Sequence, residues 1–196
     1  MSPRTEEQNE LLRSAARARI LDAALTLFGR HGYEGTTVKL IAQEAGVAQG
    51  LLYNYFQSKE HLLAEIFQQS MADVRESFAM AERVAMAERV AALIRSAFAV
   101  VRRNERFWRL SYASRAQIPV LAALGVDMVA WAGEIRTTIA RYFREAGAAN
   151  PEIEAAVLFA LIDGVSQHYV LMPDGYPLAE VEQVLLERYA SHRAES

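Results

Sequence analysis

Apolar residues recur three and four positions apart along almost the whole chain, and no segment shows convincing alternation of apolar and polar residues. This spacing puts apolar side chains on one face of an α-helix. Gly, Asn, Ser, Thr and Pro interrupt the pattern at places where helices commonly begin or end. The pattern therefore predicts an all-α protein of about nine helices.

The predicted helices are short at first and longer after residue 58. An apolar face from Ile20 to Phe28 precedes Gly32, which ends the first helix. We expect the next helices at about 36–45 and 49–56, followed by a longer one from residue 59 that Ser58 caps. Further on, we expect helices after Asn104, from Pro119 to Gly147, from Asn150-Pro151 to about Met172, and from Pro177 through Tyr189.

Composition narrows the class of protein. The chain has no Cys, its hydrophobic content is 52%, and its N-terminus is polar. No stretch approaches the roughly 20 apolar residues of a membrane span. We therefore expect a cytoplasmic protein without disulfides or membrane contact.

Charge is unevenly distributed along the chain. The net charge is −3, yet residues 1–63 contain seven basic and seven acidic residues. Between Leu11 and Leu21 the only charged residues are Arg13, Arg17 and Arg19. A solvated helix face explains these three residues as well as a nucleic-acid partner does.

The segment from Val38 to Phe56 has the spacing of a helix-turn-helix. Ala42 supplies the small residue that two steeply crossing helices need at their contact, and Gly46 suits the tight turn between them. The expected shared core consists of Ile41, Ala45, Val47, Leu52 and Phe56, with the first helix as its third wall.

Residues Tyr33–Val47 and Gly50–Leu63 resemble the DNA-binding signature of the TetR (tetracycline-repressor-like) family, and the likeness covers residues 19–63. It implies a homodimeric, all-helical bacterial repressor whose C-terminal domain binds an unknown small-molecule effector. The second short helix would then enter the major groove of a palindromic operator. The expected DNA contacts are Thr37, Lys39, Gln49, Gly50, Leu51, Tyr53, Asn54, Tyr55 and Lys59.

Side-chain chemistry fits these contacts. Gln49 can bind an adenine edge, Leu51 can touch a thymine methyl, and Gly50 permits close backbone approach. Tyr and Lys side chains can bind phosphates, a role that the resemblance assigns most directly to Tyr53 and Lys59. Ala48 departs from the family, in which Ser often precedes the recognition helix.

Other classes of function find less support. The helix-turn-helix segment could serve only as a protein–protein module. The four His have no partner at metal-ligand spacing, and neither a Gly-rich phosphate loop nor a nucleophile motif is present. We therefore expect no metal, no cofactor and no enzyme activity.

The chain divides into a DNA-binding domain at 1–58, ordered from about residue 17, and an effector-binding and dimerisation domain at 59–196. Small residues four apart on the apolar helix 151–172 form a groove that suits close approach of a second subunit. The alternative is a helix buried inside a monomer. The expected dimer residues are Ala156, Ala160, Gly164, Val181 and Leu185.

Aromatic residues with polar tips are the candidates for an effector site, because a buried polar tip needs a partner. They are Trp108, Tyr112, Trp131, His168 and Tyr169. Two hypotheses remain: a ligand-gated repressor, or a helix-turn-helix protein whose C-terminal domain is only structural. A cavity of roughly 300 Å³ or more would favour the first, and a solid core the second.

Overall fold

The computed structural model describes residues 5–113, 122, 125, 127–172 and 174–190. It contains nine α-helices and no strand over these residues, which confirms the all-α prediction. The chain forms two compact units: residues 1–68 with 113–126, and residues 69–112 with 127–196. The division lies within a long helix, ten residues beyond the predicted boundary at residue 58.

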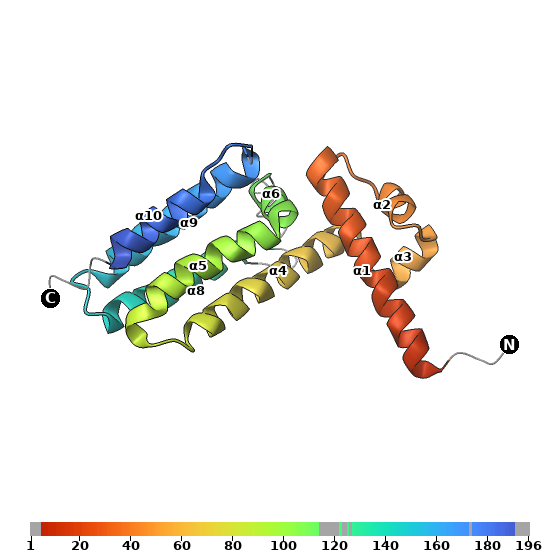
Figure 1. Ribbon diagram of the computed structural model, residues 1–196. Coiled ribbons are helices and arrows are strands. Elements are labelled where there is room, and N and C mark those ends of the chain that lie inside the picture. Colours follow the sequence, from red (N-terminus) through yellow and green to blue (C-terminus); the bar gives the residue numbers. More distant parts are fainter. Residues whose placement is uncertain (1–4, 114–121, 123–124, 126, 173, 191–196) are drawn as a thin grey trace. The chain divides into compact units, whose positions relative to one another are not determined.

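The first unit contains α1 (Glu6–His31), α2 (Val38–Glu44), α3 (Gln49–Tyr55) and the beginning of α4 (Lys59–Ala81) (Figure 1). Helix α1 starts well before residue 17, because Thr5 and Gln8 form a capping box at its N-terminus. It ends where Gly32 adopts a positive φ of 71°, as predicted. The largest fully buried side chains are those of Ile20, Phe28, Ile41, Leu52, Leu62, Leu63 and Phe67.

The second unit contains η1 (Met86–Glu88), α5 (Arg89–Arg103), α6 (Glu105–Ala113), α8 (Met128–Glu145), α9 (Pro151–Leu171) and α10 (Leu178–Ala190), together with the end of α4. Helix α5 packs against α8, α9 and α10, and α8 makes its most extensive contact with α9 (Figure 1). Leu93, Phe98, Tyr142 and Leu158 are almost fully buried in the core between these helices. No helix of the described chain is long and apolar enough to cross a membrane.

One predicted helix start and one expected helix cap need correction. The helix expected from Pro119 begins, over the described residues, only at Met128, because the Asp127 carboxylate accepts hydrogen bonds from the amides of Val129 and Ala130. Pro119 itself lies outside the described residues. Helix α9 begins at Pro151 as predicted, but the Asn150 side chain makes no capping hydrogen bond.

Candidate nucleic-acid interface and cavity

A tight glycine turn joins α2 to α3. Gly46 has a φ of 64°, a conformation that a side chain would strain. Its amide donates to the Gln43 carbonyl at 3.1 Å, and the Val47 amide donates to the Ala42 carbonyl at 3.0 Å. This pair of bonds is a Schellman motif, which satisfies the last carbonyls of α2 while the chain reverses direction. Gly46 therefore has the role that the sequence predicts.

Helix α3 presents one buried face and one open face. Leu52 is fully buried, and Phe56 directly after the helix is almost so, as expected for the shared core. Residues of the opposite face contact little of the chain: Tyr53 is 49% and Leu51 38% exposed. The exposed residues of the predicted contact set are Thr37, Lys39, Gln49, Gly50, Leu51, Tyr53 and Asn54, whereas Tyr55 is half-buried.

The two short helices differ at their N-termini. The Thr37 hydroxyl accepts a hydrogen bond from the Leu40 amide at 3.2 Å and so caps α2. Ala48 holds the corresponding position of α3 and offers no side-chain cap. The first amides of α3 thus lack the side-chain partner that stabilises most helix starts.

Lys59 is bound within its own unit. Its ammonium donates to the Tyr33 carbonyl at 2.9 Å and lies 4.1 Å from the centroid of the Tyr33 ring. The Tyr33 hydroxyl donates to the Glu60 carboxylate at 2.7 Å. Burial, followed by this hydrogen bond, raises the pKa of Tyr33, and the same bond is the main cause that lowers the pKa of Glu60. Lys59 therefore ties the start of α4 to the end of α1, besides any contact with DNA.

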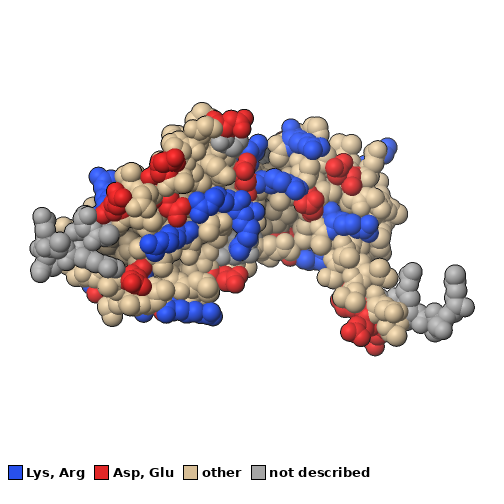
Figure 2. Space-filling model, in the orientation of Figure 1, with Lys and Arg blue, Asp and Glu red and all other residues tan. Residues whose placement is uncertain are grey.

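The three arginines of α1 have different surroundings. Arg17 forms an ion pair with Glu65 at 2.6 Å, and its guanidinium carbon lies 5.4 Å from the Phe56 ring centroid. Arg13 and Arg19 are exposed. On the face drawn in Figure 2, described Lys and Arg side chains are interspersed with acidic ones and form no uniformly basic surface.

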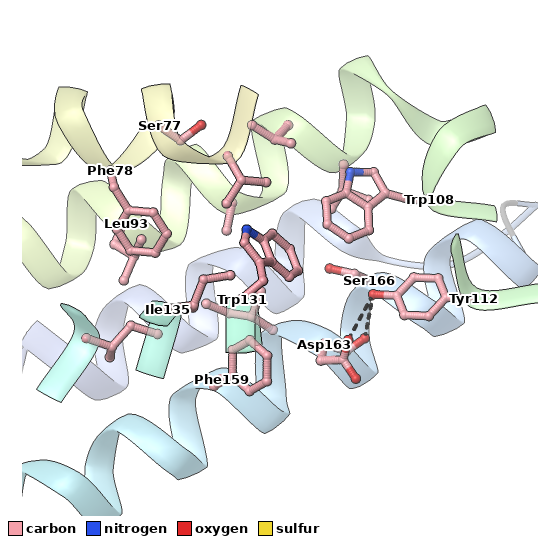
Figure 3. Close-up of a pocket in the computed structure, with 16 residues that line it drawn as sticks. Ser77, Phe78, Leu93, Trp108, Tyr112, Trp131, Ile135, Phe159, Asp163 and Ser166 are labelled. Atoms are coloured by element: carbon pink, nitrogen blue, oxygen red, sulfur yellow. Dashed lines mark hydrogen bonds between the residues drawn. The ribbon is translucent and has the colours of Figure 1, made fainter. Parts of the chain in front are cut away.

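A small cavity lies within the second unit, between α4, α5, α6, α8 and α9 (Figure 3). Its volume is about 90 Å³, well below the roughly 300 Å³ of a typical ligand site. Phe78, Leu93, Ile135 and Phe159 provide much of its apolar wall. Three predicted effector residues, Trp108, Tyr112 and Trp131, line it as well.

Few polar groups reach the cavity. The Tyr112 hydroxyl donates to the Asp163 backbone carbonyl at 3.1 Å and lies 3.3 Å from its carboxylate. The Ser166 hydroxyl and the Trp108 indole nitrogen are buried and have no hydrogen-bond partner within the described chain. Figure 3 shows Ser166 between the rings of Trp108, Trp131 and Tyr112 in that view.

The structure places the other two predicted effector residues elsewhere. His168 is exposed, and its ring centroid lies 6.3 Å from that of Tyr176. Tyr169 packs beside Val101 and Val170 and does not line the cavity. Sequence reasoning missed Asp163 and Ser166. Their spacing with Phe159 marks one face of α9, and this spacing was the available signal.

The face of α9 that carries Ile153, Ala156, Val157 and Ala160 is exposed in the described part of the chain. Ala156 and Ala160 are exposed, as are Ile153 at 63% and Val157 at 44%. A methyl group placed on Gly164 would meet no other atom within 4 Å.

Helix α10 extends the apolar surface only in part. Val184 is 61% exposed and Val181 is half-buried. Leu185, expected at the interface, is instead 5% exposed and packs in the core of its own unit. On α10 it is therefore Val184, and not Leu185, that lies outward.

No group of three or more His, Asp or Glu side chains in the described chain could hold a metal ion. The site's chemistry consists of an open helix face in one unit, and of an apolar cavity with unpaired hydrogen-bonding groups in the other.

Known proteins resemble both parts of this chain. The sequence model "Bacterial regulatory proteins, tetR family" matches residues 20–66, and "BetI-type transcriptional repressor, C-terminal" matches residues 85–193. The HTH-type transcriptional repressor KstR2 of Rhodococcus jostii (strain RHA1) is 42% identical over 62 residues. That alignment covers 32% of this chain and 30% of the relative.

Solved structures match over most of the chain. A TetR-like transcriptional regulator from Rhodococcus sp. RHA1 superposes with a TM-score of 0.76 at 18% identity, covering 92% of this chain and 97% of the other. FadR from Bacillus subtilis in complex with stearoyl-CoA has a TM-score of 0.73 at 20% identity, covering 89% and 97%. These likenesses show a shared fold. Because the two sequence models together match well over half of its length, the chain belongs to the TetR family of bacterial regulatory proteins.

Proposed function

We propose that this protein is a homodimeric transcriptional repressor that binds a palindromic operator and is released from it by a small molecule. The observation that carries the proposal is the open face of α3, whose exposed Gln49, Leu51 and Tyr53 follow a glycine turn. The exposed side chains of Gln49, Leu51 and Tyr53 contribute little to the core of their unit and are open to a partner. They suit the edges of bases and the thymine methyl groups in a major groove. Cytoplasmic location and lack of catalytic activity belong to the same proposal.

Selection of DNA from a random pool by the purified protein tests the proposal. We expect an enriched palindrome whose half-sites lie about 34–36 Å apart, or one helical turn. Gln49→Ala should relax the preference at one base pair in each half-site and cost about 1–3 kcal/mol against the best sequence. Failure to enrich any motif, at any salt concentration, would refute DNA recognition.

Release by an effector has a more specific requirement. The ligand must bind better to a conformation that binds the operator poorly. A tenfold loss of operator affinity requires a coupling free energy of about 1.4 kcal/mol between ligand binding and operator binding. The stearoyl-CoA in the Bacillus subtilis FadR complex supports a ligand site in this fold. Because the coupling is reciprocal, operator DNA should weaken ligand binding by the same factor.

A DNA-binding protein with a non-sensing C-terminal domain is the second candidate. The cavity volume of about 90 Å³ favours it, because a typical effector needs more room. A screen for small molecules that stabilise the protein against heat, followed by operator titration with each hit, separates the two candidates. Hits that never change operator affinity would support the second candidate and contradict release by a ligand.

A further inference from the structure

The described lining of the cavity carries almost no charge. Sixteen described residues line it, and none of these sixteen is Lys, Arg or His. Asp163 contributes the one carboxylate of this lining, and the Tyr112 hydroxyl lies against it. Among these described residues an anionic ligand would meet a like charge and no cation, so they would leave its charge without compensation.

Two hydrogen-bonding groups of the lining have no partner in the described chain. Ser166 is only 2% exposed, and the indole nitrogen of Trp108 is also buried. A buried polar group without a partner lowers stability, so each such group calls for an explanation. An indole N–H can only donate, and a hydroxyl can donate as well. Both groups therefore suit an acceptor atom inside the cavity.

We propose that the cavity binds an uncharged, mainly apolar molecule that carries a hydrogen-bond-accepting oxygen, for which Ser166 and Trp108 supply the donors. The regulatory role of this binding rests on the proposed function above. The binding itself rests only on the cavity and its two unpaired groups.

A cationic ligand fits these groups less well. The aromatic rings and Asp163 would attract a cation. A cation, however, accepts no hydrogen bond, so the Trp108 N–H would remain unpaired beside it. A neutral ketone, ester or alcohol satisfies the donor and leaves the bond between Tyr112 and Asp163 intact.

The volume of the cavity limits which probe should be used. An apolar cavity of about 150 Å³ is known to admit benzene. At about 90 Å³ this cavity is smaller, so even a six-membered ring has to displace side chains of the wall. Cyclohexanone combines a ring of this size with one carbonyl oxygen. Methylcyclohexane has a similar shape without the oxygen.

The experiment measures the binding of these two probes to the full-length protein through its intrinsic fluorescence. Both Trp residues of the chain, Trp108 and Trp131, line the cavity, so a bound probe should change the emission. In Ser166→Ala and in Trp108→Phe, cyclohexanone affinity should fall about three- to tenfold relative to methylcyclohexane affinity. Ser77→Ala removes another hydroxyl of the lining and should leave the ratio unchanged.

Charged probes complete the test. Cyclohexanecarboxylate and cyclohexylammonium should bind at least tenfold more weakly than cyclohexanone. Tighter binding of either charged probe, an unchanged ratio in both variants, or no binding of cyclohexanone to the unmodified protein would overturn the inference. Ser166→Ala should fold, because its hydroxyl has no partner in the described chain to lose.

A parallel operator titration separates this inference from the proposed function. Bound cyclohexanone that leaves operator affinity unchanged contradicts release by the ligand but supports the assignment of the cavity. A protein that binds no DNA, yet distinguishes the two probes through Ser166 and Trp108, contradicts the proposed DNA recognition but still supports the assignment of the cavity.

Discussion

Gly50 is a residue that the fold does not require to be glycine. It is exposed near the start of α3, its φ is not positive, and an added methyl group would meet nothing within 4 Å. If α3 enters the major groove as we propose, the same methyl group would stand where the helix approaches DNA. Gly50→Ala should therefore preserve or slightly raise thermal stability, because Ala favours a helix over Gly. It should weaken operator binding by about 1–3 kcal/mol, as overpacking does.

Thermal melting and operator titration of the same preparations measure both effects. Gly29→Ala is a matched control, because Gly29 is an exposed helical glycine of α1 with equally open surroundings. The control should retain operator affinity. Full affinity in Gly50→Ala would mean that the backbone of α3 does not approach DNA closely at this point.

Lys59 and Lys39 provide a comparison between two predicted phosphate contacts. The ammonium of Lys59 also binds the Tyr33 carbonyl and ring, whereas Lys39 is exposed on α2. Each alanine variant should reduce the slope of log affinity against log salt by about 1. Lys59→Ala alone should also lower the melting temperature. An unchanged slope in Lys59→Ala would show that this ammonium stabilises only the fold.

At the scale of the residue, the sequence predicted which side chains of α3 are buried and which are open, because a short helix between fixed turns has one possible register. It did not predict the bond between Lys59 and Tyr33 or that between Arg17 and Glu65. Both join residues far apart in the chain. Such pairs depend on how the helices cross, which the spacing of apolar residues does not specify.

Helix α3 is short, and Ala48, its N-cap residue, has no side-chain capping group. Ala48→Ser should supply the missing acceptor and stabilise α3 by about 1 kcal/mol. Amide exchange within α3 should then slow about fivefold where exchange occurs by local opening. Hydrogen exchange followed by mass spectrometry measures this change.

Operator affinity distinguishes two outcomes in the Ala48→Ser variant. If DNA binding orders α3, the variant should bind more tightly, because less order has to be gained on binding. Slower exchange without a gain in affinity would mean that α3 is already ordered in the free protein. Unchanged exchange would contradict the view that the missing cap weakens this helix.

The start of α8 shows where element prediction failed. The apolar spacing from Leu121 to Tyr142 favoured one long helix after Pro119. The described chain instead has a positive φ of 80° at Gly125 and a capped start at Asp127. The spacing of apolar residues continues across this break and so favoured a single helix. Gly125 and Asp127 are residues that commonly end and begin helices, and they indicated the break that the spacing did not.

At the scale of the whole molecule, the all-α class followed from the sequence, but the cavity did not. Trp108, Tyr112 and Trp131 were selected for their polar tips, and all three line it. His168 met the same criterion and lies on the exposed surface. A cavity is a gap left by packing between several helices, so its lining depends on their relative rotation. The near-uniform apolar character of α9 carries little information about that rotation.

The outer face of α9 leads to the prediction about assembly. Gly164 lies in line with the exposed Ala156 and Ala160, and a Cβ atom placed there would have open space around it. We infer that its small size suits close contact with a second subunit related by a two-fold axis, as the proposed homodimer requires. The exposed Ile153, Val157 and Val184 would be buried in the same contact.

Gly164→Leu should leave the monomer folded, because the Cβ atom that it adds has open space around it and Leu favours a helix over Gly. At a close helix contact it should cost about 1–3 kcal/mol, and the two-fold symmetry makes the change occur twice in each dimer. Gly133→Leu on α8 is the matched control, since its surroundings within the chain are equally open and it lies outside the apolar face of α9. Light scattering over a concentration series should show a dimer for the unmodified protein and the control. For Gly164→Leu it should show dissociation at concentrations at least tenfold higher, and an unmodified protein that is monomeric at micromolar concentration would refute the interface.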